Sequence, residues 1–207
     1  MQVRQQPPRK NTFAGEARRA QIVEAAVATI AELGYTQASF ARIAERAGLS
    51  STRLISYHFA GRAELIQQVL ARLHGEMGRY MYERMRAQPT ASEALRTYIR
   101  ALVGYIATHR PQMKALLEIF LNFQSEEGTR SYDARTDLAV LAPIEEILQW
   151  GQREGDFRAF DTRVMALTVQ RAIDGLPFLL ETDPGRDLDA YAEELVTLFD
   201  LATRGPE

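Results

Sequence analysis

The chain has 207 residues, of which 46% are hydrophobic, and its formal net charge is −2. This length and composition are typical of a soluble globular protein that can bury a core. The absence of cysteine excludes disulfides, thiolate metal sites and cysteine nucleophiles. No segment approaches the roughly 18 uncharged apolar residues that cross a bilayer, and the polar N-terminus lacks an apolar stretch of the secretory type. We therefore expect a cytoplasmic protein.

Charge is distributed unevenly along the chain. Residues 1–72 contain ten Arg and Lys residues against five Asp and Glu, whereas residues 73–207 contain fifteen against twenty-two. A basic first third followed by an acidic remainder indicates that one end of the protein meets a polyanion. Chance clustering of charges on solvated helix faces is the alternative.

Nearly every segment repeats apolar residues every three to four positions, and none alternates as a β-strand would, so the sequence predicts an all-α protein. Residues 1–12 are polar and basic, contain two prolines, and are expected to form a disordered arm. Pro143 and Pro177 lie inside helical patterns, so we expect a kink or break near each. The expected helices, about nine, cover in chain order 16–33, 40–47, 50–59, 62–88, 92–108, a segment from about 111, 133–153, 162–181 and 188–203.

The third expected helix mixes hydrogen-bonding and apolar side chains within about three turns. At 100° per residue, Arg53, Ser56 and Tyr57 fall on one side. Ile55 and Phe59 point the other way and can anchor against the two preceding helices. A short helix, a glycine-containing turn and a second helix with an outward polar stripe are typical of a helix-turn-helix, whose second helix enters the DNA major groove. An ordinary exposed helix face is the alternative, although it explains an exposed tyrosine poorly.

Residues 34–65, GYTQASFARIAERAGLSSTRLISYHFAGRAEL, resemble the DNA-binding signature of the TetR family of bacterial transcriptional regulators. The shared features are a Gly-aromatic pair, the Ala47-Gly48 turn, and an aromatic residue that ends the helix before a basic residue and Glu-Leu. From Gly48 to Phe59 the chain is one residue longer than the commonest form of the family, which favours a helix start at Ser51. The resemblance implies DNA contacts from eight residues: Ser39, Ser51, Thr52, Arg53, Ser56, Tyr57, His58 and Arg62.

The resemblance also implies an architecture and a function. Residues 13–61 would form an N-terminal three-helix helix-turn-helix DNA-binding domain. Residues 62–207 would form a larger helical effector-binding and dimerisation domain, linked to the first by the helix from residue 62. Such a protein would be a sequence-specific transcriptional regulator, a homodimeric repressor that a small-molecule effector releases from a palindromic operator.

Two helical stripes near the C-terminus fit a dimer interface made of two helices from each subunit. An intrachain core would explain the same stripes and remains the alternative. The expected interface residues are Met165, Val169, Leu176, Leu180, Leu188, Tyr191, Leu195, Leu198 and Phe199.

Aromatic and methionine side chains on the inner faces of the middle helices are candidates for an effector pocket, because soft, adaptable side chains suit an apolar ligand. Sparse charge in these helices favours an apolar or aromatic effector, although simple core packing would produce the same pattern. The candidates are Met81, Tyr105, Met113, Leu117, Phe120, Phe123, Trp150 and Phe178.

Catalytic motifs are absent from the sequence. It contains no glycine-rich phosphate loop, no G-x-S-x-G and no H-E-x-x-H. His74 and His109 have no partner at metal-ligand spacing. We therefore expect neither an enzyme nor a bound metal or cofactor. A helical small-molecule-binding or protein-interaction module without DNA binding is the second hypothesis.

Overall fold

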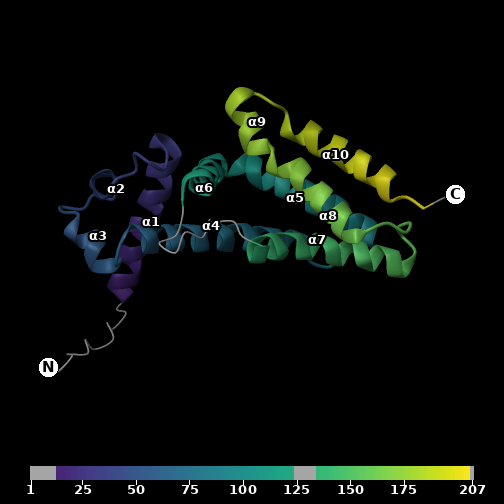
Figure 1. Ribbon diagram of the computed structural model, residues 1–207, viewed down its shortest axis with the longest axis horizontal. Coiled ribbons are helices and arrows are strands. Elements are labelled where there is room, and N and C mark those ends of the chain that lie inside the picture. Colours follow the sequence, from purple (N-terminus) through teal and green to yellow (C-terminus); the bar gives the residue numbers. More distant parts are fainter. Residues whose placement is uncertain (1–12, 124–133, 206–207) are drawn as a thin grey trace, which may run out of the picture.

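The computed structural model describes residues 13–123 and 134–205, with the backbone alone for 134–138. The arm expected at 1–12 lies outside these ranges. The described residues form α-helices and no β-strand, which confirms the all-α prediction (Figure 1). None of these helices is both long and apolar enough to cross a membrane. The helices are α1 (Phe13–Leu33), α2 (Phe40–Arg46), α3 (Arg53–His58), α4 (Arg62–Met85), α5 (Ala91–Thr108), α6 (Arg110–Asn122), α7 (Ala134–Glu154), α8 (Thr162–Asp174), α9 (Leu176–Thr182) and α10 (Leu188–Thr203).

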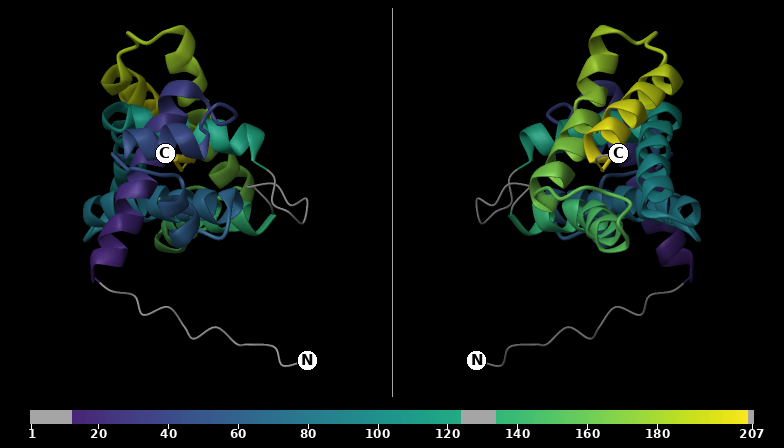
Figure 2. Two further views of the ribbon diagram at one scale, coloured as in Figure 1. Left: turned by 90° about the vertical axis from the view of Figure 1, so that its left-hand side faces the viewer. Right: turned by 90° about the vertical axis from the view of Figure 1, so that its right-hand side faces the viewer.

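Helices α1, α2 and α3 gather at one end of the molecule, and α4 runs from that end toward the other (Figure 1). Seen from the far end, α5, α7, α8 and α10 form a bundle (Figure 2). The buried hydrophobic residues form two clusters, one at each of these ends. The cluster that we call the N-terminal core joins α1, α2, α3, the first half of α4 and α6. The cluster that we call the C-terminal core joins α5, α7, α8, α10 and the start of α9.

Helix α4 belongs to both clusters. Leu65, Val69 and Leu73 on its first half are buried in the N-terminal core. Met77 and Met81 on its second half pack against the C-terminal core. Because one continuous helix carries both sets, a change in how α4 sits on one core changes its relation to the other.

Helix boundaries follow the capping chemistry of the sequence. Thr90, Asp161 and Asp187 each stand at an N-cap and accept a hydrogen bond from the backbone N–H three residues on, at 3.0–3.1 Å. Gly34 follows α1 with a φ of +81°, in the left-handed region that glycine adopts without strain. These local signals explain why the expected helix ends lie close to the observed ones.

The two internal prolines behave differently. The helix expected at 162–181 breaks at Gly175 into α8 and α9, which places Pro177 in the first turn of α9, where its missing N–H donor costs no helical hydrogen bond. This break makes ten helices in the described ranges instead of about nine. Helix α7 instead continues through Pro143, whose side chain is exposed. The break expected as one alternative at Pro143 is therefore absent, since solvent can bind the carbonyl that loses its partner, and the kink expected as the other alternative stays a prediction.

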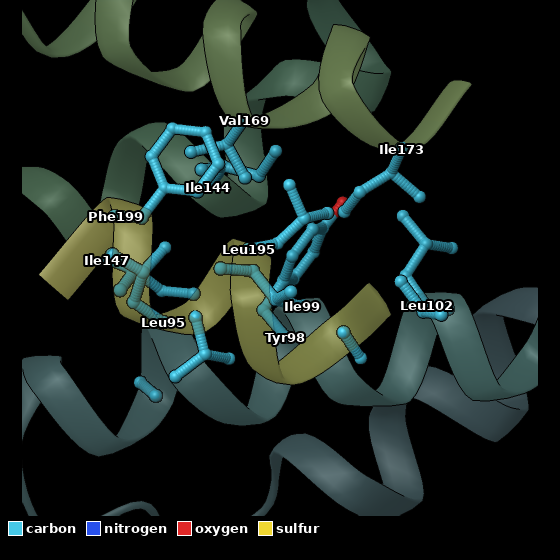
Figure 3. Packing of buried hydrophobic residues seen from close by; sticks show 14 of the residues in the cluster. Leu95, Tyr98, Ile99, Leu102, Ile144, Ile147, Val169, Ile173, Leu195 and Phe199 are labelled. Atoms are coloured by element: carbon cyan, nitrogen blue, oxygen red, sulfur yellow. The ribbon is translucent and has the colours of Figure 1, made fainter. Parts of the chain in front are cut away.

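Most of the expected dimer stripe lies inside the subunit. Figure 3 shows Val169, Leu195 and Phe199 packed among side chains of α5 and α7. Five of these residues belong to the C-terminal core and are at most 7% exposed, which favours the intrachain core left open for them, while their place in an interface stays a prediction: Val169, Leu176, Leu188, Leu195 and Phe199. Met165, Leu180 and Tyr191 are half-buried against the same core, and Leu198 is 52% exposed.

Candidate nucleic-acid interface

The α2–α3 turn has the geometry of a tight helix-turn-helix. Ser39 Oγ caps α2 by accepting the N–H of Arg42 at 3.4 Å. Gly48 follows the end of α2 with a φ of +63°, and the N–H of Leu49 returns to the carbonyl of Ala44 at 2.8 Å. This bond satisfies a terminal carbonyl of α2 and reverses the chain within a few residues. A side chain other than glycine at position 48 would be strained by the backbone angle alone.

Helix α3 has two opposed faces, as its sequence predicts. Ile55 is 0% and Phe59 1% exposed, and both belong to the N-terminal core. Arg53 and Ser56 are exposed, and Tyr57 is 61% exposed. The outward side thus offers a guanidinium, a hydroxyl and a phenol on a helix whose inward side is fixed.

The start of α3 carries two more hydroxyls. Ser51 and Thr52 are exposed, and Ser51 Oγ accepts the N–H of Arg53 at 3.1 Å. The backbone N–H of Leu54 already bonds to the Ser51 carbonyl at 3.2 Å, so helical bonding begins at Ser51 although α3 itself spans Arg53–His58. His58 is half-buried, and its ring meets the Tyr57 ring edge-on at 5.1 Å between centroids.

A side chain of α1 holds the end of α3. Arg19 donates to the carbonyl of His58, forms an ion pair with Glu64 at 3.1 Å, and places its guanidinium 4.4 Å from the centre of the Phe59 ring. Glu64 Oε2 also accepts the N–H of Ala60 at 2.6 Å. The carboxylate therefore ties the residues after α3 to both α1 and α4. No local pattern in the sequence indicates this role of Arg19, because its partners lie about forty residues away along the chain.

Arg62 occupies a position between the two domains expected from the sequence. Its guanidinium donates to the carbonyl of Ala38 at 2.8 Å and to that of Tyr35, and it lies 4.5 Å from the centre of the Tyr35 ring. These contacts give Arg62 a role in holding the α1–α2 turn. Its expected contact with a DNA phosphate stays a prediction.

The same turn is held from its other side by α6. The N–H of Tyr35 donates to Glu118 Oε2 at 2.9 Å, and the Tyr35 ring meets Phe123 edge-on at 6.3 Å. A Cβ at Gly34 would stand 3.2 Å from the same Glu118 oxygen, so this close approach favours glycine there. Tyr35 and Glu118 are 83 residues apart, and no local pattern in the sequence indicates that they meet.

Comparison with known proteins agrees with this geometry. The family model described as bacterial regulatory proteins, tetR family, matches residues 22–69, which span α2, α3 and their supports on α1 and α4. Residues 22–69 are therefore similar to the N-terminal part of TetR-family regulators.

Relatives of the chain include regulators of known name. The HTH-type transcriptional regulator BetI 1 of Chromohalobacter salexigens is 32% identical over 108 residues, which is 52% of each chain. The chain thus spans about half the length of that relative. BetI of Cronobacter sakazakii is 26% identical over 171 residues, or 80% of this chain and 84% of the relative. The structure of FadR from Bacillus subtilis in complex with stearoyl-CoA superposes with a TM-score of 0.73 at 24% identity, over 86% of this chain and 96% of that one.

The effector residues expected from the sequence do not converge on one site. Phe123 is buried in the N-terminal core, whereas Trp150 and Met81 pack against the C-terminal core. Phe120 and Phe178 are 48% and 49% exposed, and Leu117 is half-buried. Met113 alone among the eight lines a cleft between α1, α6 and α9. The placement of Phe123, Trp150 and Met81 favours the alternative of simple core packing, whereas Phe120 and Phe178 lie largely at the surface.

Tyr105 is the exception among these residues, because its buried hydroxyl has no hydrogen-bond partner among the described groups. Its ring stacks on His109 at 4.0 Å and meets Tyr80 edge-on at 5.1 Å. Burial, with the Glu76 carboxylate as a smaller cause, raises the pKa of Tyr105 to about 12. The phenol is therefore neutral at physiological pH, and it sits at the junction of α5 and α6.

Proposed function

We propose that this protein is a sequence-specific DNA-binding transcriptional regulator of the TetR family, a repressor that a small-molecule effector releases from its operator. The observation that carries this proposal is the pair of faces on α3. Ile55 and Phe59 fix the helix from within, and Arg53, Ser56 and Tyr57 are exposed beside them. The match of residues 22–69 to the TetR family supports the same conclusion. Because its partner is DNA, we propose that the protein works in the cytoplasm and performs no catalysis.

The groups on α3 suit different parts of a DNA duplex. Arg53 can bind O6 and N7 of guanine in bidentate fashion and so read one base pair. The hydroxyls of Ser39, Ser51 and Thr52 lie at helix starts, where side chains and backbone N–H groups bind phosphate. Ser56, Tyr57 and His58 extend the contact surface along α3. Base contacts give sequence preference, whereas phosphate contacts set the orientation of the helix.

We propose that two subunits associate through exposed apolar side chains of α8 and α10. Val164 and Leu167 on α8 are 60% and 39% exposed, and Leu198 and Leu201 on α10 are 52% and 59% exposed. Each pair is three residues apart, so its two members share one helix face. A twofold dimer presents two α3 helices to two half-sites about one DNA turn apart, which predicts a pseudo-palindromic operator.

The test is selection of bound duplexes from a random pool at near-physiological salt. We expect an enriched palindrome with the intact protein and no enrichment with a double variant, Arg53→Ala and Tyr57→Ala. Arg79→Ala is the matched control, since Arg79 is an exposed arginine of α4 outside the α2–α3 unit. A pool that stays random with the intact protein would favour the second hypothesis, a helical binding module without DNA recognition.

A further inference from the structure

A cleft of about 420 Å³ opens between α1, α6 and α9. Figure 1 shows α6 placed between α1 and α9. The walls are mainly apolar and include Ala28 and Ala31 of α1, Met113 of α6, and Leu180 of α9. The volume falls in the range of about 300–1,000 Å³ that is typical of small-molecule sites.

The cleft exists because the α1 wall is made of small side chains. Ala28 and Ala31 are three residues apart and therefore face the same side of α1. Opposite them, Leu180 belongs to α9 and packs against the C-terminal core. A ligand between these walls touches both cores at once.

Four charged side chains line the cleft, and three of them are paired. Lys114 forms an ion pair with Glu181 at 3.3 Å, and Glu32 forms one with Arg46 of α2. Arg110 donates to the carbonyl of Pro184 at 2.8 Å and has no carboxylate partner among the described residues. The site therefore combines an apolar interior with one guanidinium whose charge is not neutralised, a combination that suits a carboxylate on an apolar body.

We propose that this cleft binds an apolar carboxylic acid and that this acid is the class of effector that regulates DNA binding. The proposal rests on the proposed function for its regulatory part. Effector binding here is sensitive to the arrangement of the two cores, because α1 supplies one wall while α6 and α9 supply the others. A ligand that fits one arrangement better than the other shifts the equilibrium between them. Glu32 extends the coupling, since its ion pair reaches α2 of the helix-turn-helix.

The experiment uses the full chain and two probes, decanoate and 4-phenylbutanoate, with decylamine as the cationic counterpart of the first. We expect calorimetry to show binding of the acids and not of the amine. Arg110→Ala should weaken acid binding about 10- to 100-fold, the loss typical of a charge-assisted hydrogen bond. Ala28→Leu should remove acid binding by filling the cleft. Arg79→Ala is the matched control and should bind the acids as the parent protein does.

Operator binding provides the second measurement. With the parent protein, the bound acid should lower operator affinity at least fivefold, the lower end of typical allosteric coupling. Ala28→Leu should bind the operator without responding to the acid, and its thermal unfolding curve shows whether the substitution is tolerated.

The outcomes separate this inference from the proposed function. If neither acid binds, or if Arg110→Ala and Ala28→Leu bind the acids like the parent protein, the cleft assignment is wrong. If the acids bind as expected but the protein enriches no operator, the proposed function fails while the site stands. If acid and operator bind without affecting each other, the regulatory part of the inference is wrong.

Discussion

The two cores of this protein differ in the kind of side chain that their helices leave exposed to solvent. The N-terminal core buries one side of α3 and leaves the other side as a stripe of hydrogen-bonding groups. The C-terminal core buries the apolar stripes of α8 and α10 and leaves single apolar side chains such as Leu198 outside. A polar stripe on a short helix indicates a binding function from the sequence alone. An apolar residue that lies outside a core can be identified only once the residues of that core are known.

The two cores also share helices, so they are not independent. Helix α6 follows α5 in sequence, yet Ala115 and Ile119 of α6 and its C-cap residue Phe123 are buried in the N-terminal core. Arg62 and Glu118 hold the same α1–α2 turn from α4 and from α6. A displacement of α6 would therefore change its contacts with the α1–α2 turn, which precedes the helix-turn-helix.

The largest expected effect concerns the exposed apolar side chains of the C-terminal region. Replacing Leu198 and Leu201 together by Glu should give monomers, because four buried carboxylates in a twofold interface repel one another. Operator affinity should fall by about 100- to 10,000-fold, the usual contribution of linking two binding units. Size-exclusion chromatography with light scattering and a DNA titration measure both effects. Tyr82→Glu is the matched control, since Tyr82 is 69% exposed on α4. Double variants that still elute as dimers would place the interface elsewhere.

The second prediction separates the two faces of α3. Ile55→Ala should lower the free energy of unfolding by about 2–5 kcal/mol, the usual cost of removing a buried aliphatic side chain. Tyr57→Ala should leave the free energy of unfolding within about 0.5 kcal/mol of the parent value, as for other surface substitutions, and should weaken operator binding. Urea denaturation and DNA titration of both variants provide the comparison. Equal destabilisation by the two substitutions would contradict the assignment of faces.

The third prediction sharpens the division between base and phosphate contacts. Arg53→Ala should cost about 1–3 kcal/mol of binding free energy and relax the preference at one base position.

Arg62→Ala should instead weaken binding to specific and random duplexes alike and reduce the salt slope by about 1. It should also lower the free energy of unfolding, because Arg62 donates to the carbonyls of Tyr35 and Ala38. Titrations at several salt concentrations distinguish the two variants. Identical losses of specificity from both would refute the proposed roles.

The smallest expected effect lies on the surface of the C-terminal region. Arg100 donates two hydrogen bonds to Glu193, at 2.6 and 2.7 Å, and this contact lowers the pKa of Glu193. A carboxyl whose folded pKa is lowered adds stability above its ordinary pKa of about 4.3, and this contribution disappears as pH falls through the folded value.

Glu193→Gln should therefore be slightly less stable than the parent protein at pH 7, and this difference should be smaller at about pH 3. Glu194→Gln, at the neighbouring exposed position, is the control. Urea denaturation at both pH values measures the difference, and a gap that is equally large at low pH would show that the ion pair is not its cause.

Much of the fold could be predicted from local patterns. The helix expected at 188–203 matches α10 at both ends, and the break near Pro177 is present. The division of α3 into a buried and an exposed face was also predictable, because helical periodicity fixes which side chains share a side. Helix α3 and its immediate flanks thus carry their candidate function in sequence alone.

The dimer stripe and the effector pocket could not be predicted in the same way. Leu195 and Leu198 are both leucines of one helix, yet the first is 7% exposed and the second 52%. The hydrophobic effect has no direction, so an apolar side chain gains similarly from its own core, a second subunit or a ligand. The apolar periodicity of a helix indicates that one of its faces is buried. It does not indicate whether the same subunit, a second subunit or a ligand covers that face.

Local residue patterns are enough to predict most of the helices, their caps and the polar stripe of α3, because each depends on residues a few positions apart. The tertiary structure decided which apolar faces form the cores, brought Glu118 to the turn at Tyr35, and opened the cleft beside Ala28 and Ala31. Those features depend on contacts between segments far apart in the chain. Only the packing of whole helices against one another determines such contacts.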